Sequence, residues 1–139
     1  MEKYNCIIIM NQQLDQVLMC LRTKNPYKGL YNLVGGKVEV DESDFEAAYR
    51  ELFEETGIKR QDITLHRLVD FRYHQHHIEV QSYVGVINQD YPLTEEVNTL
   101  HWLSSDENFF DMTKFAGEGN IGHMIEHVMF SKEKLLNTN

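Results

Sequence analysis

The stretch that decides the fold runs from residue 35 to residue 58 and reads GGKVEVDESDFEAAYRELFEETGI. It opens with a glycine pair and a short polar turn. The residues that follow include three of the types that cap helix N-termini, namely Asp41, Ser43 and Asp44. Such side chains accept hydrogen bonds from the free backbone amides at the start of a helix. Gly57 is typical of a left-handed C-terminal cap. The sequence therefore predicts a helix over residues 44–56.

The predicted helix has two distinct faces. Its apolar residues recur at steps of three and four and should form one buried face: Phe45, Ala48, Tyr49 and Leu52. Glu51, Glu54 and Glu55 stand at i, i+3 and i+4, so their carboxylates project together on a neighbouring face, where Arg50 can pair with Glu54. Clustered carboxylates repel one another unless a positive charge lies among them. Mg²⁺, a hard cation that takes oxygen ligands, meets that need.

The alternative interpretation of such glutamates is a solvated acidic helix face. Here, however, glycines, glutamates and an arginine occur together in the pattern G-x5-E-x7-R-E-U-x-E-E-x-G-U over residues 36–58, where U is a bulky aliphatic residue. This pattern resembles the Nudix box of the MutT/Nudix hydrolases. The resemblance implies an α/β fold, namely an α/β/α sandwich with a mixed β-sheet between helices.

The resemblance also implies a reaction, the Mg²⁺-dependent hydrolysis of a phosphoanhydride bond in a nucleoside diphosphate derivative, with Mn²⁺ as a substitute cation. By similarity to the family, the metal ligands are the Gly35 carbonyl, Glu51, Glu55 and, as a third ligand or as the water-orienting base, Glu54. Arg50 is similar to the family residue that holds a catalytic glutamate through its guanidinium fork. Glu42 corresponds to a loop anchor rather than to a ligand.

Further contacts are expected outside the box. Many family members add an acid from the loop before a late strand, and Glu95 and Glu96 are the candidates here, with Glu96 favoured as a metal ligand. The general base stays open between the box glutamates and this loop. Lys37 and Arg22 are candidate phosphate contacts, and ordinary surface cations are the alternative.

The substrate is indicated by residues around the box. Asn32 occupies the position at which the MutT-like sanitisation branch reads an oxidised purine, and an amide both donates and accepts. The acidic pair of that branch is missing from residues 111–116, and Glu118 is the candidate replacement. We therefore expect a MutT-like (d)NTP pyrophosphohydrolase such as an 8-oxo-dGTP diphosphatase. The alternatives are a hydrolase of ADP-ribose or dinucleoside polyphosphates, or a non-catalytic nucleotide-sensing Nudix domain.

Length and composition limit the function classes. The 139 residues predict one domain, 1–139, and the net charge of −9 argues against a nucleic-acid polymer as partner while permitting a small nucleotide. Neither a long apolar run nor a basic-then-apolar N-terminus is present, so we expect no membrane contact and a cytoplasmic location. Cys6 and Cys20 are expected to be free thiols. The composition does not decide the oligomeric state, and a homodimer is compatible with it.

Hydrophobic patterning predicts the remaining elements. The expected strands cover residues 4–10, 17–21, 30–34, 63–73, 77–87 and 97–103, with an extended segment at 37–40. The strands at 63–73 and 77–87 should form a long hairpin. A second helix should begin at Asn120 and continue to Leu136, because Ile121, Met124 and the apolar residues that follow share one helical face.

Overall fold

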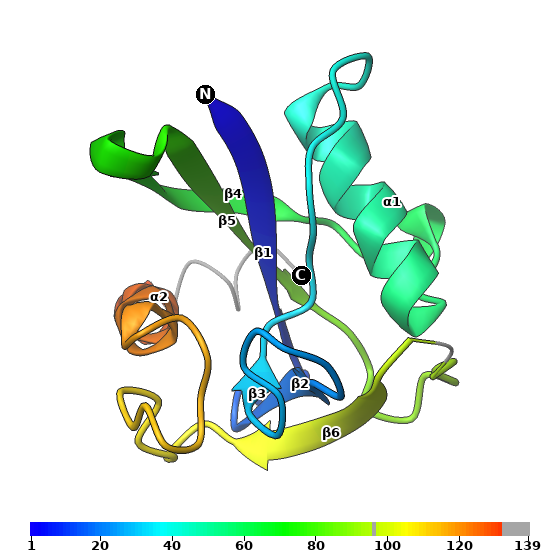
Figure 1. Cartoon of the computed structure of the whole chain (residues 1–139). Coiled ribbons are helices and arrows are strands. Elements are labelled where there is room, and N and C mark those ends of the chain that lie inside the picture. The colour runs from blue at the N-terminus through cyan, green and yellow to red at the C-terminus, as the bar shows by residue number, and fades with distance from the viewer. Residues whose placement is uncertain (96, 132–139) are drawn as a thin grey trace.

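The computed structural model describes residues 1–95 and 97–131, which form a sheet with two α-helices (Figure 1). The elements in chain order are β1 (Glu2–Met10), β2 (Gln16–Leu21), β3 (Tyr31–Asn32), α1 (Asp44–Thr56), η1 (Arg60–Asp62), β4 (His66–Tyr73), η2 (His74–His76), β5 (Ile78–Val86), β6 (Thr99–Ser104) and α2 (Asn120–Phe130). None of the helices described is long and apolar enough to cross a membrane.

The sheet is mixed, as the sequence predicts. Its strands follow the order β3-β2-β1-β5-β4, and β6 pairs with β2 outside this path. β1 runs parallel to β5 from Glu2 opposite Ile78 to Met10 opposite Val86, whereas the other strand pairs are antiparallel. The long hairpin of β4 and β5 is confirmed, and its tip is the short turn η2.

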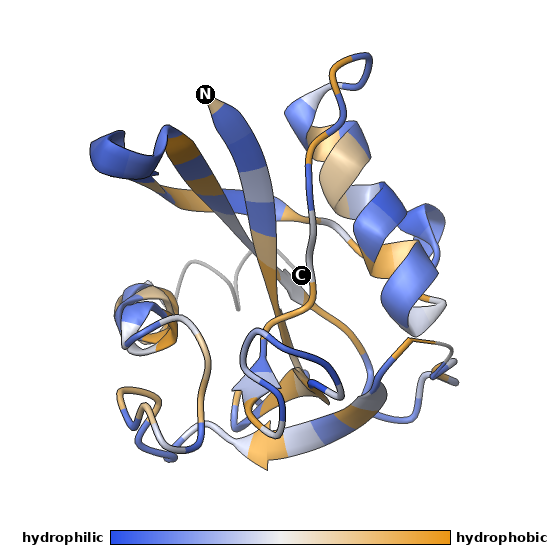
Figure 2. Ribbon diagram, viewed as in Figure 1, coloured by the Kyte–Doolittle hydropathy of each residue, from blue (hydrophilic) through white to orange (hydrophobic). Residues whose placement is uncertain are grey.

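Side-chain alternation along β1 divides the core into two layers. Ile7 and Ile9 belong to the cluster that contains Ala48 and Leu52 of α1, whereas Ile8 belongs, with apolar residues of α2, to the other cluster. Successive residues of a strand point to opposite faces, so one apolar strand supplies both layers. Figure 2 shows β1 changing from hydrophilic at its N-terminal end to hydrophobic further along. The helices thus cover opposite faces of the sheet, which confirms the α/β/α sandwich.

Helix α1 has the predicted bounds. The Ser43 side chain accepts a bond from the backbone N–H of Glu46 at its N-terminus, and Gly57 ends the helix with φ = 79°. Ala48 and Leu52 are fully buried, and burial of a leucine side chain contributes about 1.5–3 kcal/mol. Phe45 was predicted to lie on the buried face of this helix, and that prediction is wrong. The residue is 39% exposed, because it lies in the first helical turn, where its ring meets that of Tyr83 in a T-shaped contact.

The largest differences from the predicted strands are at the third and fourth strands, β3 and β4. The strand expected at 30–34 is reduced to β3, because Leu30 and Leu33 are bonded within turns and to neighbouring side chains. β4 begins at His66 rather than at residue 63, since the Leu65 N–H donates to the Tyr49 hydroxyl (2.9 Å) instead of to a strand. The second helix begins at Asn120 as predicted. Its expected continuation to Leu136 falls beyond the described residues.

Candidate active site

The glycine loop lies between β1 and the box helix α1. Lys37 and Val34, on either side of the glycine pair, form bridges with Tyr4 and Ile7 of β1. A β-carbon on Gly36 would lie 2.5 Å from the carboxyl carbon of Glu51. A larger residue at this position would therefore displace the Glu51 carboxylate, which occupies the space of a side chain.

The second box glutamate is bound to the same loop. The Gly35 N–H donates to Oε2 of Glu55 at 2.7 Å. The two glycines thus bring the loop backbone against Glu51 and Glu55, which stand one helical turn apart. The predicted grouping of the loop with these carboxylates is present in the structure.

Arg50 connects the remaining acidic residues of the box. Its Nε and Nη2 donate to the two carboxylate oxygens of Glu42 at 3.0 and 2.7 Å, and Nη1 donates to Glu51 at 3.0 Å and to Glu54 at 3.2 Å. Nη2 also donates to the Lys37 carbonyl at 3.0 Å. The fork-shaped, bidentate contact is therefore made to Glu42, and a single nitrogen serves the two other glutamates.

Glu42 anchors the loop, as the sequence predicts. Besides Arg50, its carboxylate accepts the Glu39 N–H at 2.8 Å. The hydrogen bonds from Arg50, followed by the bond from Glu39, lower the pKa of Glu42 to about 2. This glutamate thus stays ionised and bound to the arginine at neutral pH.

The two glutamates beside the glycines are in the opposite electrostatic situation. Burial raises the pKa of Glu55 to about 7, although the Gly35 N–H opposes the shift, and the charge of Glu51 raises it further. Burial also raises the pKa of Glu51, against the hydrogen bond from Arg50. The charges of Arg50 beside Glu51 and of Arg22 near Glu55 are thus too weak to offset the burial of these two half-buried carboxylates.

These donors suit a hard divalent cation. Carboxylate oxygens and a loop carbonyl are the ligands that Mg²⁺ takes, and a cation would add positive charge that offsets the burial of Glu51 and Glu55. Within 1–95 and 97–131, no three histidine, cysteine or acidic side chains already converge as a ready ligand set. In this arrangement Glu51 and Glu54 are both bound to Nη1 of Arg50.

A family model described as NUDIX domain matches residues 3–126. The chain belongs to the NUDIX family. The segment from Gly36 to Ile58 is accordingly its Nudix box, and the mixed sheet between two helices is the fold on which that box is placed.

Relatives with known descriptions agree with this membership. A curated ADP-ribose pyrophosphatase of Methanocaldococcus jannaschii is 46% identical over 44 residues, which are 32% of this chain and 26% of that protein. A MutT/nudix family protein of Enterococcus faecalis has 25% identity and a TM-score of 0.61 over 74% of this chain and 43% of its own. The match thus spans less than half the length of either relative. An Ap4A hydrolase of C. elegans shares the fold, with a TM-score of 0.75, 16% identity and coverage of 96% and 99%.

The candidate phosphate contacts differ in position relative to the Nudix box. Burial raises the pKa of Glu55, and Arg22 lies close enough for its positive charge to lower that pKa in part. Its Nε donates to the Pro26 carbonyl at 2.7 Å, within its own loop. The Lys37 ammonium instead pairs with Glu2 at 3.4 Å, at the outer end of β1. The structure therefore brings Arg22, but not the Lys37 side chain, toward the buried glutamates.

The candidate base-reading residues come from two segments that run side by side. Tyr31 of β3 pairs with Phe115, so Asn32 stands next to the segment that leads to Glu118. The Asn32 Oδ1 accepts the Leu33 N–H at 2.9 Å. This bond uses only the oxygen of the amide and leaves the two N–H donors of Nδ2 out of it. Glu118 is exposed, directly before α2.

Sequence reasoning missed two residues of this region. Burial raises the pKa of Tyr73, the last residue of β4; a bond with Asn120, the first residue of α2, lowers it, and the charge of Glu118 raises it. No local pattern predicts this meeting. The other residue is Asn5, whose Oδ1 accepts the Gly36 N–H at 2.9 Å. The available signal was a polar residue inside an apolar strand.

The loop before β6 lies against the end of the box helix. Its Thr94 N–H donates to the Thr56 carbonyl at 2.9 Å, which places Glu95, the next residue, near the end of that helix. The Glu95 carboxylate accepts the Leu100 N–H at 2.8 Å and so serves the start of β6. Glu96, the favoured ligand of the two, lies outside the described residues.

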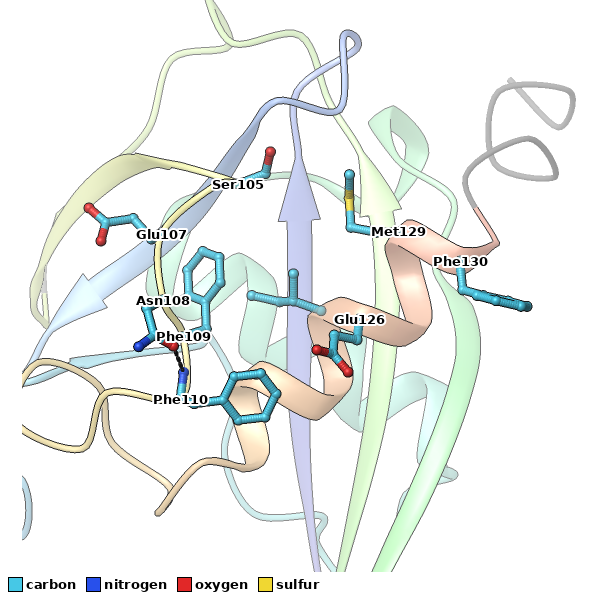
Figure 3. A pocket seen from close by; sticks show the side chains of 10 residues that line it. Ser105, Glu107, Asn108, Phe109, Phe110, Glu126, Met129 and Phe130 are labelled. Carbon is cyan, nitrogen blue, oxygen red and sulfur yellow. Dashed lines mark hydrogen bonds between the residues drawn. The ribbon is translucent and has the colours of Figure 1, made fainter.

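A separate groove of about 550 Å³ lies on the other side of the molecule, between residues 105–110 and α2 (Figure 3). The Phe110 N–H donates to Oδ1 of Asn108 at 3.2 Å within the loop that forms one wall. None of the predicted site residues lines this groove. It is therefore distinct from the candidate active site.

Proposed function

We propose that this NUDIX protein is a Mg²⁺-dependent hydrolase that cleaves a phosphoanhydride bond of a nucleoside diphosphate derivative. The observation that carries the proposal is the packing of the buried Glu51 and Glu55 carboxylates against the Gly35–Gly36 loop. Burial raises the pKa of both groups. Carboxylates placed in this way are stabilised by a divalent cation, and Mn²⁺ would substitute for Mg²⁺.

Each box residue has a distinct task in this proposal. Glu51, Glu55 and the Gly35 carbonyl would hold the cation, and a cation bound there would supply positive charge to the phosphate oxygens during cleavage. The side chain of Glu54 is 55% exposed and so can reach a water molecule. We assign it the role of general base. Arg50 holds Glu54 from four residues away and keeps its carboxylate oriented.

The first substrate class is a purine nucleoside triphosphate, with 8-oxo-dGTP as the leading candidate. The support is the Asn32 amide, which lies beside the segment that carries Glu118. Its bond to Leu33 uses only Oδ1 and not the N–H donors of Nδ2. The product would be a nucleoside monophosphate and pyrophosphate. The second candidate is ADP-ribose, which is favoured by the 46% identity over 44 residues to an ADP-ribose pyrophosphatase.

A substrate panel tests both candidates. The panel contains 8-oxo-dGTP, dGTP, the other dNTPs, ADP-ribose and diadenosine polyphosphates, each assayed with Mg²⁺ and with Mn²⁺ and compared by kcat/KM. We expect turnover that EDTA abolishes and the highest kcat/KM for 8-oxo-dGTP. A higher value for ADP-ribose would favour the second candidate. Binding without turnover of any compound would instead indicate a sensor domain.

A further inference from the structure

The side chain that deserves an explanation beyond the Nudix box is Asn5. It is only 2% exposed, on the β1 face whose next two positions, Ile7 and Ile9, are fully buried and apolar. A buried amide in such a layer is unfavourable unless its polar atoms are bonded. Asn5 therefore needs a role that an aliphatic residue could not fill.

One half of that role is visible in the contacts of the glycine pair. The Asn5 Oδ1 accepts the Gly36 N–H at 2.9 Å, and the Asn5 N–H donates to the Gly36 carbonyl at 2.8 Å. The Gly36 N–H and the Gly35 carbonyl belong to the same planar trans peptide and point to opposite sides of it. By holding the N–H, Asn5 directs the Gly35 carbonyl away from β1.

The other half of the amide has no partner. Among the residues that the structure describes, the Asn5 Nδ2 is the one buried side-chain nitrogen or oxygen without a hydrogen bond. The identity of this atom follows from the contact, since the Gly36 N–H is a donor and only Oδ1 can accept it. A buried donor is thus left beside the loop that also contacts Glu51.

Asn11, just beyond the other end of β1, shows what a purely structural asparagine does in this protein. It is also 2% exposed. Its Oδ1 accepts the N–H groups of Asp15 and Gln16, both at 3.0 Å, and its Nδ2 donates to Asp15 at 2.6 Å and to Gln89 at 3.1 Å. Every polar atom of that amide is used within the fold, unlike those of Asn5.

We propose that Asn5 is a positioning residue of the cation site. Its Oδ1 orients the Gly35–Gly36 peptide so that the Gly35 carbonyl faces the cation, and its Nδ2 donates to an oxygen of the cation-bound site. The inference rests on the proposed function, because it assumes that a cation binds at Gly35, Glu51 and Glu55.

Substitution of Asn5 tests the orienting half. Asn5→Leu is expected to weaken Mn²⁺ binding, measured by calorimetry, about tenfold or more, as is usual when a residue that orients a metal ligand is lost. We expect kcat to fall more than the KM for the nucleotide changes. Asn11→Leu is the matched control, and its folded form should bind Mn²⁺ as the wild type does. An affinity of Asn5→Leu within threefold of wild type would overturn this half.

The donor half is tested in the wild-type protein, so it does not depend on whether a variant folds. On saturation with Mg²⁺, the side-chain amide proton signals of Asn5 should move downfield in a ¹⁵N-resolved NMR spectrum, while those of Asn11 stay in place. Unmoved Asn5 signals at saturation would overturn the donor role. If the Glu55→Gln variant bound Mn²⁺ as tightly as the wild type, the proposed function itself would be overturned, and this inference with it.

Discussion

The molecule has two glycine-containing turns that precede its two α-helices, and they use glycine for different reasons. At Gly36, a β-carbon would lie 2.5 Å from the Glu51 carboxyl group. At Gly117 and Gly119, the backbone is left-handed, with φ of 82° and 90°, and the nearest atoms to a β-carbon would be 3.8 and 3.9 Å away. Gly36 therefore permits close approach to the Glu51 carboxylate, whereas Gly117 and Gly119 permit a left-handed backbone.

The polar contacts of the two turns differ in the same way. Beside the first turn, Arg50 of α1 forms ion pairs with three glutamates of the same box, which lie at most eight residues away in the sequence. Before α2, the contact that fixes the turn joins Asn120 to Tyr73, which is 47 residues away. The Arg50 contacts, at the end proposed to carry the chemistry, are thus encoded within the Nudix box, whereas the end proposed to read the base depends on how distant segments meet.

The strongest test of this comparison is to remove the proposed general base, Glu54, from the helix that follows the first turn. Glu54→Gln should lower kcat about 10²–10⁴-fold, the range of general-base catalysis, in a steady-state assay of the preferred nucleotide. Stability should change little, because the side chain is 55% exposed and its ion pair with Arg50 lies at the surface.

Glu46→Gln is the matched control for that substitution. Glu46 is exposed on the same helix, and its side chain belongs to no part of the proposed site. Its kcat should equal that of the wild type. If Glu54→Gln turned over at near wild-type rates, Glu54 would have no part in the mechanism and the base would have to be sought at Glu51 or in the loop before β6.

A pair of glycine substitutions sharpens the comparison of the two turns. Gly36→Ala should weaken Mn²⁺ binding about 10–100-fold, because the added carbon displaces the Glu51 carboxylate. Gly117→Ala should leave Mn²⁺ affinity unchanged but lower the free energy of unfolding by about 1–2 kcal/mol, since φ = 82° strains an alanine. Calorimetric titration and urea unfolding of both variants provide the measurements. The reverse result would mean that the two turns had been assigned the wrong roles.

The same contrast explains what the sequence could predict. The bounds of α1, its caps and the pairing of Arg50 with Glu54 follow from spacing within a single segment, and the structure has them as predicted. The carboxylates of Glu51, Glu54 and Glu55 do not yet converge as a ligand set among the described residues. The exposed position of Phe45 could not be predicted from periodicity, because a helical period does not show how far the sheet extends beneath the first turn.

Long-range contacts were beyond sequence reasoning for a related reason. The bond from the Gly36 N–H to Asn5 spans 31 residues, and that between Asn120 and Tyr73 spans 47. Both depend on strand register, which a single sequence specifies only through alternation. Asn32 was identified from its place before the glycine pair, and its neighbour Phe115 became apparent only from the bridge between Tyr31 and Phe115.

The smallest expected effect concerns the base-reading end. Asn32→Ala should raise the KM for the preferred purine nucleotide about three- to tenfold and change kcat less, because one hydrogen bond to a neutral base contributes about 1 kcal/mol. Asn108→Ala is the control, since its Oδ1 likewise accepts a nearby backbone N–H, at 3.2 Å, but in the loop that lines the separate groove. Ratios of kcat/KM for purine and pyrimidine triphosphates provide the measurement. If Asn32→Ala kept the wild-type ratio, base selection would have to come from Tyr73, Asn120 or Glu118, and the second turn would be the reading element on its own.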